Sequence, residues 1–578
     1  MGEVTAEWNL LQLAFIAVYP AYLSYIRIVD GMSLIALYVF LFVLCIPAMF
    51  IQMKLGGYSQ KSILGVLSQH LPIAKGFGIT LLIDLLLTCI YLGPLVCHFG
   101  MYAVISMLEH PNGYLQLSNG IGNISGFPTW TFTEQLEGLG IPVLPVALTA
   151  VWLLVFLFTA FGPRVAGWIL FVLGPGFVAT LFAVLGYGYK NLNMDHTNEF
   201  LMKFYNLNFK GFIDFSNTQS FVKNWNDGFM LLMNSFPVWS AIAVSLGKFV
   251  GKGKISRNVG WLIVIVMYAM VVQIPQLAMA PYIGNLIASV DKTRLRENTF
   301  NGMELVFMAM PAAFSELKVP PIYAMLFFLS LFISGFMLLC VSMLTLVDNM
   351  VENMTSSYTP LHNKRSLCTF VMTFILMTIL LGLGILQTTT AGMYYTYLLD
   401  QSVLRLRFII VFLLAVCVII VYVKHTFALW ERIIVSVWCI FAATATAGFW
   451  VYSFYLDIDR SLTYANHRYA QTWDLVSWII SAVPYLAIIA VAMYSCATHE
   501  GMCGERCHYM MCGSEEETHN YDGYYPAAEP TAPPAYSPYM DSGHSHGYGD
   551  SLYPMDELNK HYDPEMEPLD TRLRSSRI

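Results

Sequence analysis

The side chains with the greatest chemical potential in this sequence lie inside long apolar stretches. Asp84 stands in the apolar stretch 78–108, and His98 follows it fourteen residues later. On a straight helix the two would lie about 21 Å apart, which is too far for direct contact. An ionisable group inside a membrane is costly and therefore suggests a function. Asp84 is a candidate substrate-binding residue on a water-filled path; alternatively, it faces a partner helix or a shallow aqueous vestibule.

A second group of polar residues lies beside a proline. Asn234 and Ser235 come just before Pro237 in the apolar stretch 225–249, and Pro20 interrupts the first apolar stretch of the chain. In many transporters, helix breaks at corresponding positions of two halves point to a binding site near the middle of the bilayer. Asn234, Ser235 and Pro237 are therefore candidate substrate-binding residues. The alternative is an ordinary kink, with polar side chains that bridge helices.

The sequence shows no pattern typical of an enzyme. Its eleven cysteines include no Cys-x-x-Cys pair, and several are scattered through apolar stretches as small buried side chains would be. It also contains no nucleophile elbow and no phosphate-binding loop. We predict that the protein is not an enzyme and has no metal site, no cofactor and no nucleic-acid partner.

Long apolar helices must position the candidate residues. The chain is 57% hydrophobic and only 12% charged, whereas soluble domains carry about a quarter charged residues. Apolar runs that can cross a hydrocarbon core of roughly 30 Å recur from Leu10 almost to Cys496, so a lipid bilayer must surround them. We predict an all-α membrane protein with about twelve transmembrane helices, placed near 9–28, 32–53, 78–108, 141–161, 165–187, 225–249, 259–286, 323–347, 367–386, 393–423, 433–455 and 473–496.

Basic residues in the short loops orient these spans. They fall on one side of the membrane, which the positive-inside rule makes cytoplasmic: Lys61, Lys75, Arg164, Lys252, Lys254, Arg257, Lys364 and Arg365. The loop 109–140 has no Lys or Arg and contains Asn123 in an Asn-Ile-Ser sequon, so we expect it to be external and glycosylated. Both termini are then cytoplasmic, and the plasma membrane is the expected location.

The chain is expected to divide into a cytoplasmic N-terminus (1–8), a membrane body (9–496) and a cytoplasmic tail (497–578). The tail holds 15 Asp or Glu against 5 Lys or Arg and is rich in Pro and Tyr, which predicts disorder. Cys503, Cys507 and Cys512 follow the last span and are candidates for palmitoylation. Metal binding with nearby histidines and unmodified thiols are the alternatives.

A short motif in the tail suggests protein partners. P-T-A-P overlaps P-P-x-Y in the segment formed by Pro530, Thr531, Ala532, Pro533, Pro534, Ala535 and Tyr536. Such strings resemble ligands of endosomal-sorting proteins and of WW domains, which bind preformed polyproline helices in aromatic grooves. Proline-rich tails also produce these strings by chance.

Three segments resemble the neurotransmitter:sodium symporter family. Residues 46–59 read I-P-A-M-F-I-Q-M-K-L-G-G-Y-S, similar to the family's G-I-P-x-F-x-E-L-A-L-G-Q-Y-S. Residues 302–328 and 391–400 resemble its entry into the eighth helix and its G-G-x-Y…L-x-D stretch in the tenth. The resemblance, which covers roughly Trp8 to Cys496, implies a LeuT-like inverted repeat, in which spans 1–5 and 6–10 correspond, plus two further spans.

The resemblance also suggests roles for two residues. Tyr91 falls within one position of the third-helix tyrosine that hydrogen-bonds the substrate carboxylate in this family, so it is a candidate substrate-binding residue; packing is the alternative. Asp400 resembles the family's outer-gate acid. The gate arginine of the first helix is missing, and Arg405 is an unproven substitute.

Several ion-binding motifs of the family are absent. The first helix lacks the family's glycines and its sodium-binding asparagine, Leu231 replaces a chloride-associated glutamine, and Gly335 to Leu339 replace the sodium-binding serines. Ion sites need several oxygen ligands at fixed positions. We therefore expect the family's sodium and chloride sites not to form.

Together these features predict a membrane carrier of this family for a small organic solute, with amino acids among the candidates and with altered or absent sodium and chloride coupling. The alternative is a non-transporting relative that acts as a trafficking or interaction scaffold. A carrier should keep polar groups around a cavity beside Pro237, whereas a scaffold can fill that space with Phe, Leu and Met.

Overall fold

The computed structural model divides the chain into two compact units, Met1–Asn520 and Tyr521–Ile578. All residues that it describes lie in the first unit: 8–18, 31–108, 144–204, 218–233, 240–251, 260–289, 303, 305–357, 364–389, 391–407, 429–459, 462–464 and 467–498. The second unit lies outside the described residues, as do the tail cysteines and the tail motif.

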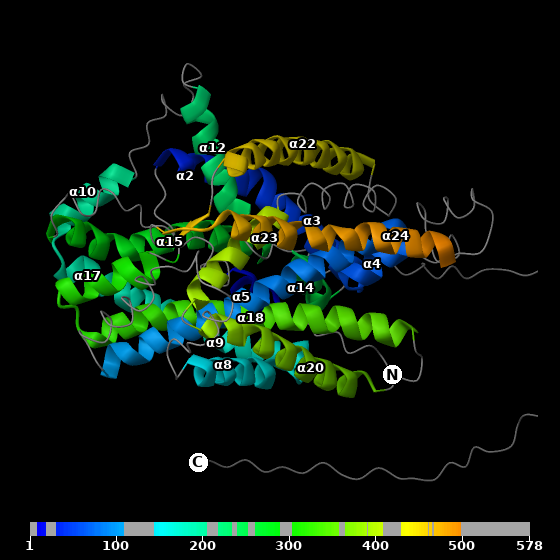
Figure 1. The fold of residues 1–578 in the computed structure, drawn as a ribbon, viewed down its shortest axis with the longest axis horizontal. Coiled ribbons are helices and arrows are strands. Elements are labelled where there is room, and N and C mark those ends of the chain that lie inside the picture. Colours follow the sequence, from blue (N-terminus) through cyan, green and yellow to red (C-terminus); the bar gives the residue numbers. More distant parts are fainter. Residues whose placement is uncertain are drawn as a thin grey trace, which may run out of the picture. The chain divides into compact units, whose positions relative to one another are not determined.

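Within the described residues the fold is almost entirely helical (Figure 1). The elements are α1 (Leu10–Val18), α2 (Gly31–Phe40), η2 (Leu41–Cys45), α3 (Ile46–Ser59), α4 (Ile63–His70), η3 (Pro72–Ala74), α5 (Lys75–Leu108), α8 (Leu144–Thr159), α9 (Pro163–Asn191), α10 (Met194–Phe204), α12 (Thr218–Met233), α14 (Ile242–Val250), α15 (Gly260–Ser289), η5 (Leu305–Ala309), α17 (Met310–Glu316), α18 (Pro321–Ser357), α20 (Arg365–Ile385), η6 (Leu386–Thr388), α22 (Leu429–Asp459), β1 (Thr463–Tyr464), β2 (His467–Arg468), α23 (Gln471–Ala482), η7 (Val483–Tyr485) and α24 (Leu486–Thr498). A further helical segment covers 392–407. The two short strands pair antiparallel.

Seven helical runs in the described part of the chain are long and apolar enough to cross a membrane: Ile35–Ser59, Pro72–Met107, Pro163–Asn191, Pro321–Ser356, Arg365–Thr388, Ile433–Tyr455 and Gln471–Thr498. Each overlaps a span predicted from the sequence. This confirms a multi-pass, nearly all-helical membrane protein. The total of about twelve spans and the inverted repeat stay predictions.

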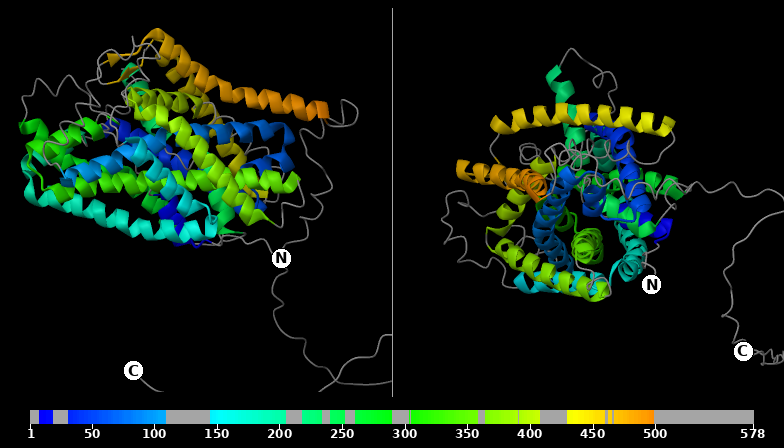
Figure 2. Two further views of the ribbon diagram at one scale, coloured as in Figure 1. Left: turned by 60° about the horizontal axis from the view of Figure 1, so that its bottom comes forward. Right: turned by 90° about the vertical axis from the view of Figure 1, so that its right-hand side faces the viewer.

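The centre of the membrane body is built around α18 and α5. α18 packs along α5 and also contacts α8, α9 and α20, and the views in Figure 2 show it running lengthwise through the bundle. Both helices bury most of their side chains, including Phe327, Leu331 and Met337 on α18. They therefore form the rigid support for any site on α5.

Prolines set several helix starts and one helix irregularity. Pro163 begins α9 directly after Gly162, whose φ of 88° is a conformation that glycine adopts easily. Pro47 lies inside the continuous run of η2 and α3, where it has no N–H to donate to the carbonyl of Val43 one turn earlier. The indole Nε1 of Trp438, on α22, donates to that carbonyl instead.

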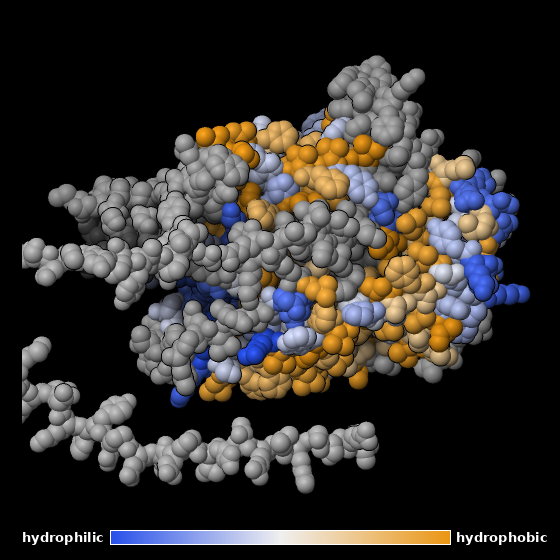
Figure 3. All heavy atoms as spheres, turned by 180° about the vertical axis from the view of Figure 1, so that it is seen from behind, coloured by the Kyte–Doolittle hydropathy of each residue, from blue (hydrophilic) through white to orange (hydrophobic). Residues whose placement is uncertain are grey.

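The outer surface is largely apolar. Large hydrophobic side chains on α9, α20 and α22 are exposed, among them Val172, Phe374 and Val437. Figure 3 shows this apolar surface along the sides of the helices, with the densest group of hydrophilic residues at one end and smaller groups elsewhere. Such a surface suits contact with lipid chains, since only hydrocarbon can cover so much apolar area without cost.

Candidate functional site

One face of α5 carries three polar side chains at helical spacing. Asp84, Thr88 and Tyr91 stand four and three residues apart, so they line the same side of the helix. All three are buried. The helical segment 392–407 supplies the group that meets them, because its last residue, Arg407, contacts both Asp84 and Thr88.

Arg407 and Asp84 form a buried ion pair. Arg407 Nε lies 3.3 Å from Asp84 Oδ1, and the two side chains are 4% and 0% exposed. Arg407 Nη2 also donates to Thr88 Oγ1 at 2.8 Å. The Thr88 hydroxyl in turn donates to the backbone carbonyl of Asp84 at 2.8 Å. The guanidinium therefore links α5 to the segment 392–407 in a site shielded from solvent, where charges are retained only when they are paired.

The second carboxylate oxygen of Asp84 is not used in this pair. Asp84 Oδ2 is buried and has no hydrogen-bond partner among the described residues. An ionised carboxylate has about four lone-pair sites, and a buried oxygen without a partner is costly. The carboxylate therefore keeps an acceptor that a proton or a donor group could use.

Two further groups share the charge of this cluster. The phenol of Tyr91 hydrogen-bonds the Arg407 side chain and interacts electrostatically with both Asp84 and Asp400. Asp400, on the segment 392–407, also interacts electrostatically with Arg407. It accepts a hydrogen bond from Gln401 Nε2 at 3.3 Å. We refer to Asp84, Thr88, Tyr91, Asp400 and Arg407 as the polar cluster; it holds two carboxylates and one guanidinium.

A broken helix turn lies next to Tyr91. Pro94, inside α5, has no N–H to donate to the Ile90 carbonyl. Gln387 Nε2, on η6, donates to this carbonyl at 3.0 Å, while its Oε1 accepts from the Thr396 hydroxyl at 2.8 Å. Gln387 thus supplies the hydrogen bond that α5 lacks at Ile90 and connects α5 to the segment 392–407.

Two residues considered in the sequence analysis have other contacts. The Nδ1 atom of His98 lies 2.7 Å from the Pro94 carbonyl, and its ring packs edge-on against Phe307. Arg405 faces α23, where its Nη1 donates to Ser477 Oγ at 3.0 Å and its guanidinium lies 4.4 Å from the Trp478 ring centre. Arg405 thus has structural partners on α23.

The sequence analysis did not single out Arg407. The available signal was its spacing, since it follows Asp400 by seven residues and therefore lies on the same face two turns along the helix. The remaining candidates lie outside the described residues and stay predictions: Asn123, Asn234, Ser235, Pro237, Cys503, Cys507, Cys512, Pro530, Thr531, Ala532, Pro533, Pro534 and Tyr536.

The positions that resemble sodium ligands on α18 carry no side-chain oxygen. Phe336, Met337, Leu338 and Leu339 are all buried, at 4% exposure or less. Their side chains are hydrocarbon or thioether groups, which do not bind hard cations such as sodium.

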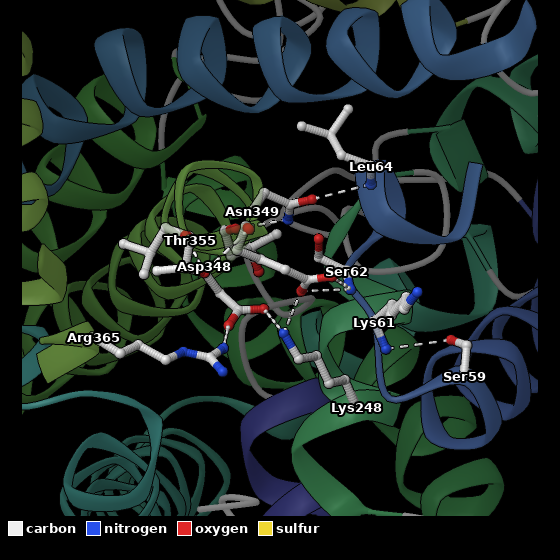
Figure 4. Close-up of polar contacts among 12 residues, drawn as sticks. Ser59, Lys61, Ser62, Leu64, Lys248, Asp348, Asn349, Thr355 and Arg365 are labelled. Carbon is white, nitrogen blue, oxygen red and sulfur yellow. Dashed lines mark hydrogen bonds and ion pairs between the residues drawn. The ribbon is translucent and has the colours of Figure 1, made fainter. Parts of the chain in front are cut away.

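A second polar network lies at the far end of α18 (Figure 4). Lys248 Nζ, on α14, lies 2.7 Å from Asp348 Oδ2 and 2.6 Å from Glu352 Oε2. Arg365, at the start of α20, lies 3.4 Å from Asp348 Oδ1. Glu352 also accepts from the backbone N–H of Ser62, just before α4. The network joins four helices at the end that the predicted topology makes cytoplasmic.

These features define a multi-pass membrane protein with charged groups buried between its apolar helices. A family model for the sodium:neurotransmitter symporter family matches residues 167–499, more than half of the chain. The protein therefore belongs to the sodium:neurotransmitter symporter family, whose members are transporters rather than enzymes, and the resemblance seen in the sequence is confirmed. A search of curated proteins gives no match.

Proposed function

We propose that the protein carries a small organic solute across the membrane, with amino acids as the first class to test, and that its sodium and chloride coupling is altered or absent. The observation that carries this proposal is the polar cluster on α5 and the segment 392–407. Buried charged groups inside a membrane body most often mark a substrate or ion pathway.

The polar cluster offers suitable chemistry for an amino acid. A guanidinium and a phenol are good donors to a carboxylate, and a carboxylate accepts from an ammonium group. Arg407 and Tyr91 supply the donors, and Asp84 Oδ2 supplies a buried acceptor. The geometry therefore supports a solute that carries both charges.

The altered coupling is supported by the side chains that replace the family's ligands. Leu231, on α12, and the buried stretch 336–339, on α18, provide no oxygen atom for an ion. A carrier built from these helices needs another driving ion or works by exchange.

The cellular setting is also part of the proposal. We place the protein in the plasma membrane with both termini in the cytoplasm, a glycan on Asn123 and palmitoyl groups on Cys503, Cys507 and Cys512. The motif that ends at Tyr536 would bind WW-domain or endosomal-sorting proteins and control the amount of carrier at the surface.

Uptake by purified protein in liposomes tests the transport function. The probes are radiolabelled amino acids and organic osmolytes, supplied as pools, with and without an inward sodium gradient. We expect saturable uptake that ignores sodium. Sodium-driven uptake would contradict the altered coupling, and correctly folded protein that neither takes up nor exchanges any probe would contradict the carrier.

A phenol-to-phenyl substitution connects uptake to the polar cluster. Tyr91→Phe keeps the ring but removes the group that hydrogen-bonds Arg407, so uptake should fall about tenfold, as expected for a lost buried hydrogen bond. Tyr187→Phe is the matched control, since Tyr187 lies on α9, where it stacks on Tyr323. Equal effects of the two substitutions would argue against a site at Tyr91.

A further inference from the structure

The polar cluster brings two acids to one guanidinium inside the membrane body. Asp84 and Asp400 bring two negative charges, and Arg407 brings one positive charge. Among the described residues, Cys89 on α5 also interacts electrostatically with Asp84, and Cys340 on α18 with Cys89; in their uncharged forms the two thiols add no charge. α8 and α24 also pack against α5 and contain no Asp, Glu, Lys, Arg or His. α20 and α4 pack against α5 as well, and they carry Arg365 at the start of α20 and His70 at the end of α4. Within the cluster, Arg407 therefore interacts with two acids at once.

In the described part of the chain, one carboxylate oxygen of Asp84 is left without a hydrogen-bond partner. Asp84 Oδ1 faces Arg407, while Asp84 Oδ2 is fully buried without a partner among the described residues. A metal ion at Oδ2 would need several more oxygen ligands, and the guanidinium 3.3 Å from Oδ1 would repel it. The nearest hydroxyl on the same face, Thr88 Oγ1, already accepts from Arg407 and donates to a carbonyl.

A proton meets these requirements. It needs no cavity and no further ligand, because it forms a single O–H bond with the carboxylate. It neutralises the Asp84 carboxylate. We propose that Asp84 is a proton-binding site and that the proton bound there takes the place of sodium as the driving ion.

The proposed step is balanced and has a structural consequence. A proton from the outer solution binds Oδ2, no bond breaks, and the acid becomes neutral; the same O–H bond releases the proton to water on the inner side. Once Asp84 is neutral, Arg407 no longer faces an ionised partner at Oδ1. Its charge is then available to Asp400 or to a carboxylate on the solute, which would couple proton binding to solute binding.

This inference rests on the proposed function, and a pH gradient tests it. Liposomes containing the full chain take up a radiolabelled mixture of the standard amino acids in sodium-free buffer, with and without an inward proton gradient. One coupled proton should raise accumulation by up to about tenfold for each pH unit of gradient. The ratio of uptake with and without the gradient should fall to one in Asp84→Asn and stay above one in Asp84→Glu. A ratio of one in the unmodified protein, or a raised ratio in Asp84→Asn, would overturn the proposal.

Proton binding can also be measured without any solute. Infrared difference spectra between acidic and alkaline buffer should show the C=O stretch of a protonated carboxylic acid, absent in Asp84→Asn and present in Asp400→Asn. If Asp84→Asn does not fold, two other measurements test the site. The band should remain in Asp400→Asn, and in the unmodified protein it should shift in heavy water, as expected for a protonated carboxylic acid. Loss of the band in Asp400→Asn would show that the proton binds Asp400 rather than Asp84 and would overturn the proposal.

The two failures are distinguishable. Absence of uptake and exchange under all gradients, with the infrared band present and dependent on Asp84, would leave the proton site standing and remove the carrier. Uptake without the band and without a response to pH would leave the carrier standing and remove the proton site.

Discussion

At the scale of single residues, the main feature is a charged pair that lies away from solvent. The pair contributes little net stability on formation, because removing both charges from water is costly. Replacing only one of the two residues is strongly destabilising, since it leaves one buried charge without a partner. The net contribution of the pair to stability is therefore measured only when Arg407 and Asp84 are changed together.

Arg407→Gln should destabilise the purified protein by about 3–5 kcal/mol, because it leaves the Asp84 carboxylate buried and unpaired. The double variant Asp84→Asn, Arg407→Gln should recover most of that loss. Thermal unfolding in detergent, followed as a double-mutant cycle, measures the coupling. Additive effects of the two substitutions would mean that the pair does not form.

Gln387→Leu should destabilise the protein by about 1–3 kcal/mol, because the Ile90 carbonyl beside Pro94 loses its donor. Thr389→Val is a suitable control: its hydroxyl donates only to the nearby Leu386 carbonyl in the described contacts. The same unfolding measurement in detergent compares the two variants. A larger effect for Thr389→Val would refute the role given to Gln387.

Sequence reasoning found part of the polar cluster at this scale. Asp84 stood out because a charge interrupts an apolar run, and Tyr91 because of a family resemblance. Arg407 lies inside the predicted span 393–423, but the sequence does not show which acid a basic residue faces. Only the three-dimensional pairing of residues 323 positions apart reveals its partner.

At the scale of helices, the apolar runs predicted the elements well, and the differences have physical causes. α18 extends to Ser357, although its apolar pattern ends near 347. Asp348 and Glu352 lower the hydropathy there, yet both are satisfied by Lys248, so the helix continues. α4 and α10 are short helices between spans, without a run long enough to mark them.

The crossing of α3 and α14 depends on two glycines. A Cβ atom on Gly247 would lie 2.0 Å from the Met53 carbonyl oxygen, and one on Gly56 would lie 1.9 Å from that of Val244. The two backbones therefore touch, as small residues allow in membrane helices. Any larger side chain must push the helices apart.

Gly247→Ala should lower the free energy of unfolding of the protein by about 1–3 kcal/mol, as expected for an overpacked contact. The matched control is Gly382→Ala on α20, where a Cβ meets nothing within 4 Å. Alanine there should be neutral or slightly stabilising, because it favours helix more than glycine does. A neutral Gly247→Ala would show that α3 and α14 lie further apart than described.

At the scale of the whole membrane body, the network around Lys248 joins helices that are distant in sequence. Two ion pairs on one ammonium group, with Lys248, Asp348 and Glu352 only 10–18% exposed, hold α14 against α18. Arg365 and Ser62 extend the connection to α20 and α4. This end of the bundle should therefore move as one unit.

Lys248→Met should remove the ammonium partner of Asp348 and Glu352 and speed amide hydrogen exchange in α4 and at the adjoining ends of α14 and α18. Mass spectrometry of hydrogen exchange in detergent or nanodiscs measures the change. Lys190→Met, at the exposed end of α9, is the control. Unchanged exchange in α4 would show that the network does not hold this end together.

Pro94 and Gln387 also have a consequence for the evolution of the protein. At the Ile90 carbonyl, the glutamine supplies the N–H that the proline lacks. A relative with another residue at position 94 would regain the ordinary helical hydrogen bond, and its position 387 would no longer need to donate to the Ile90 carbonyl. We therefore expect positions 94 and 387 to change together across lineages. Relatives that keep proline at position 94 should also keep a hydrogen-bond donor at position 387.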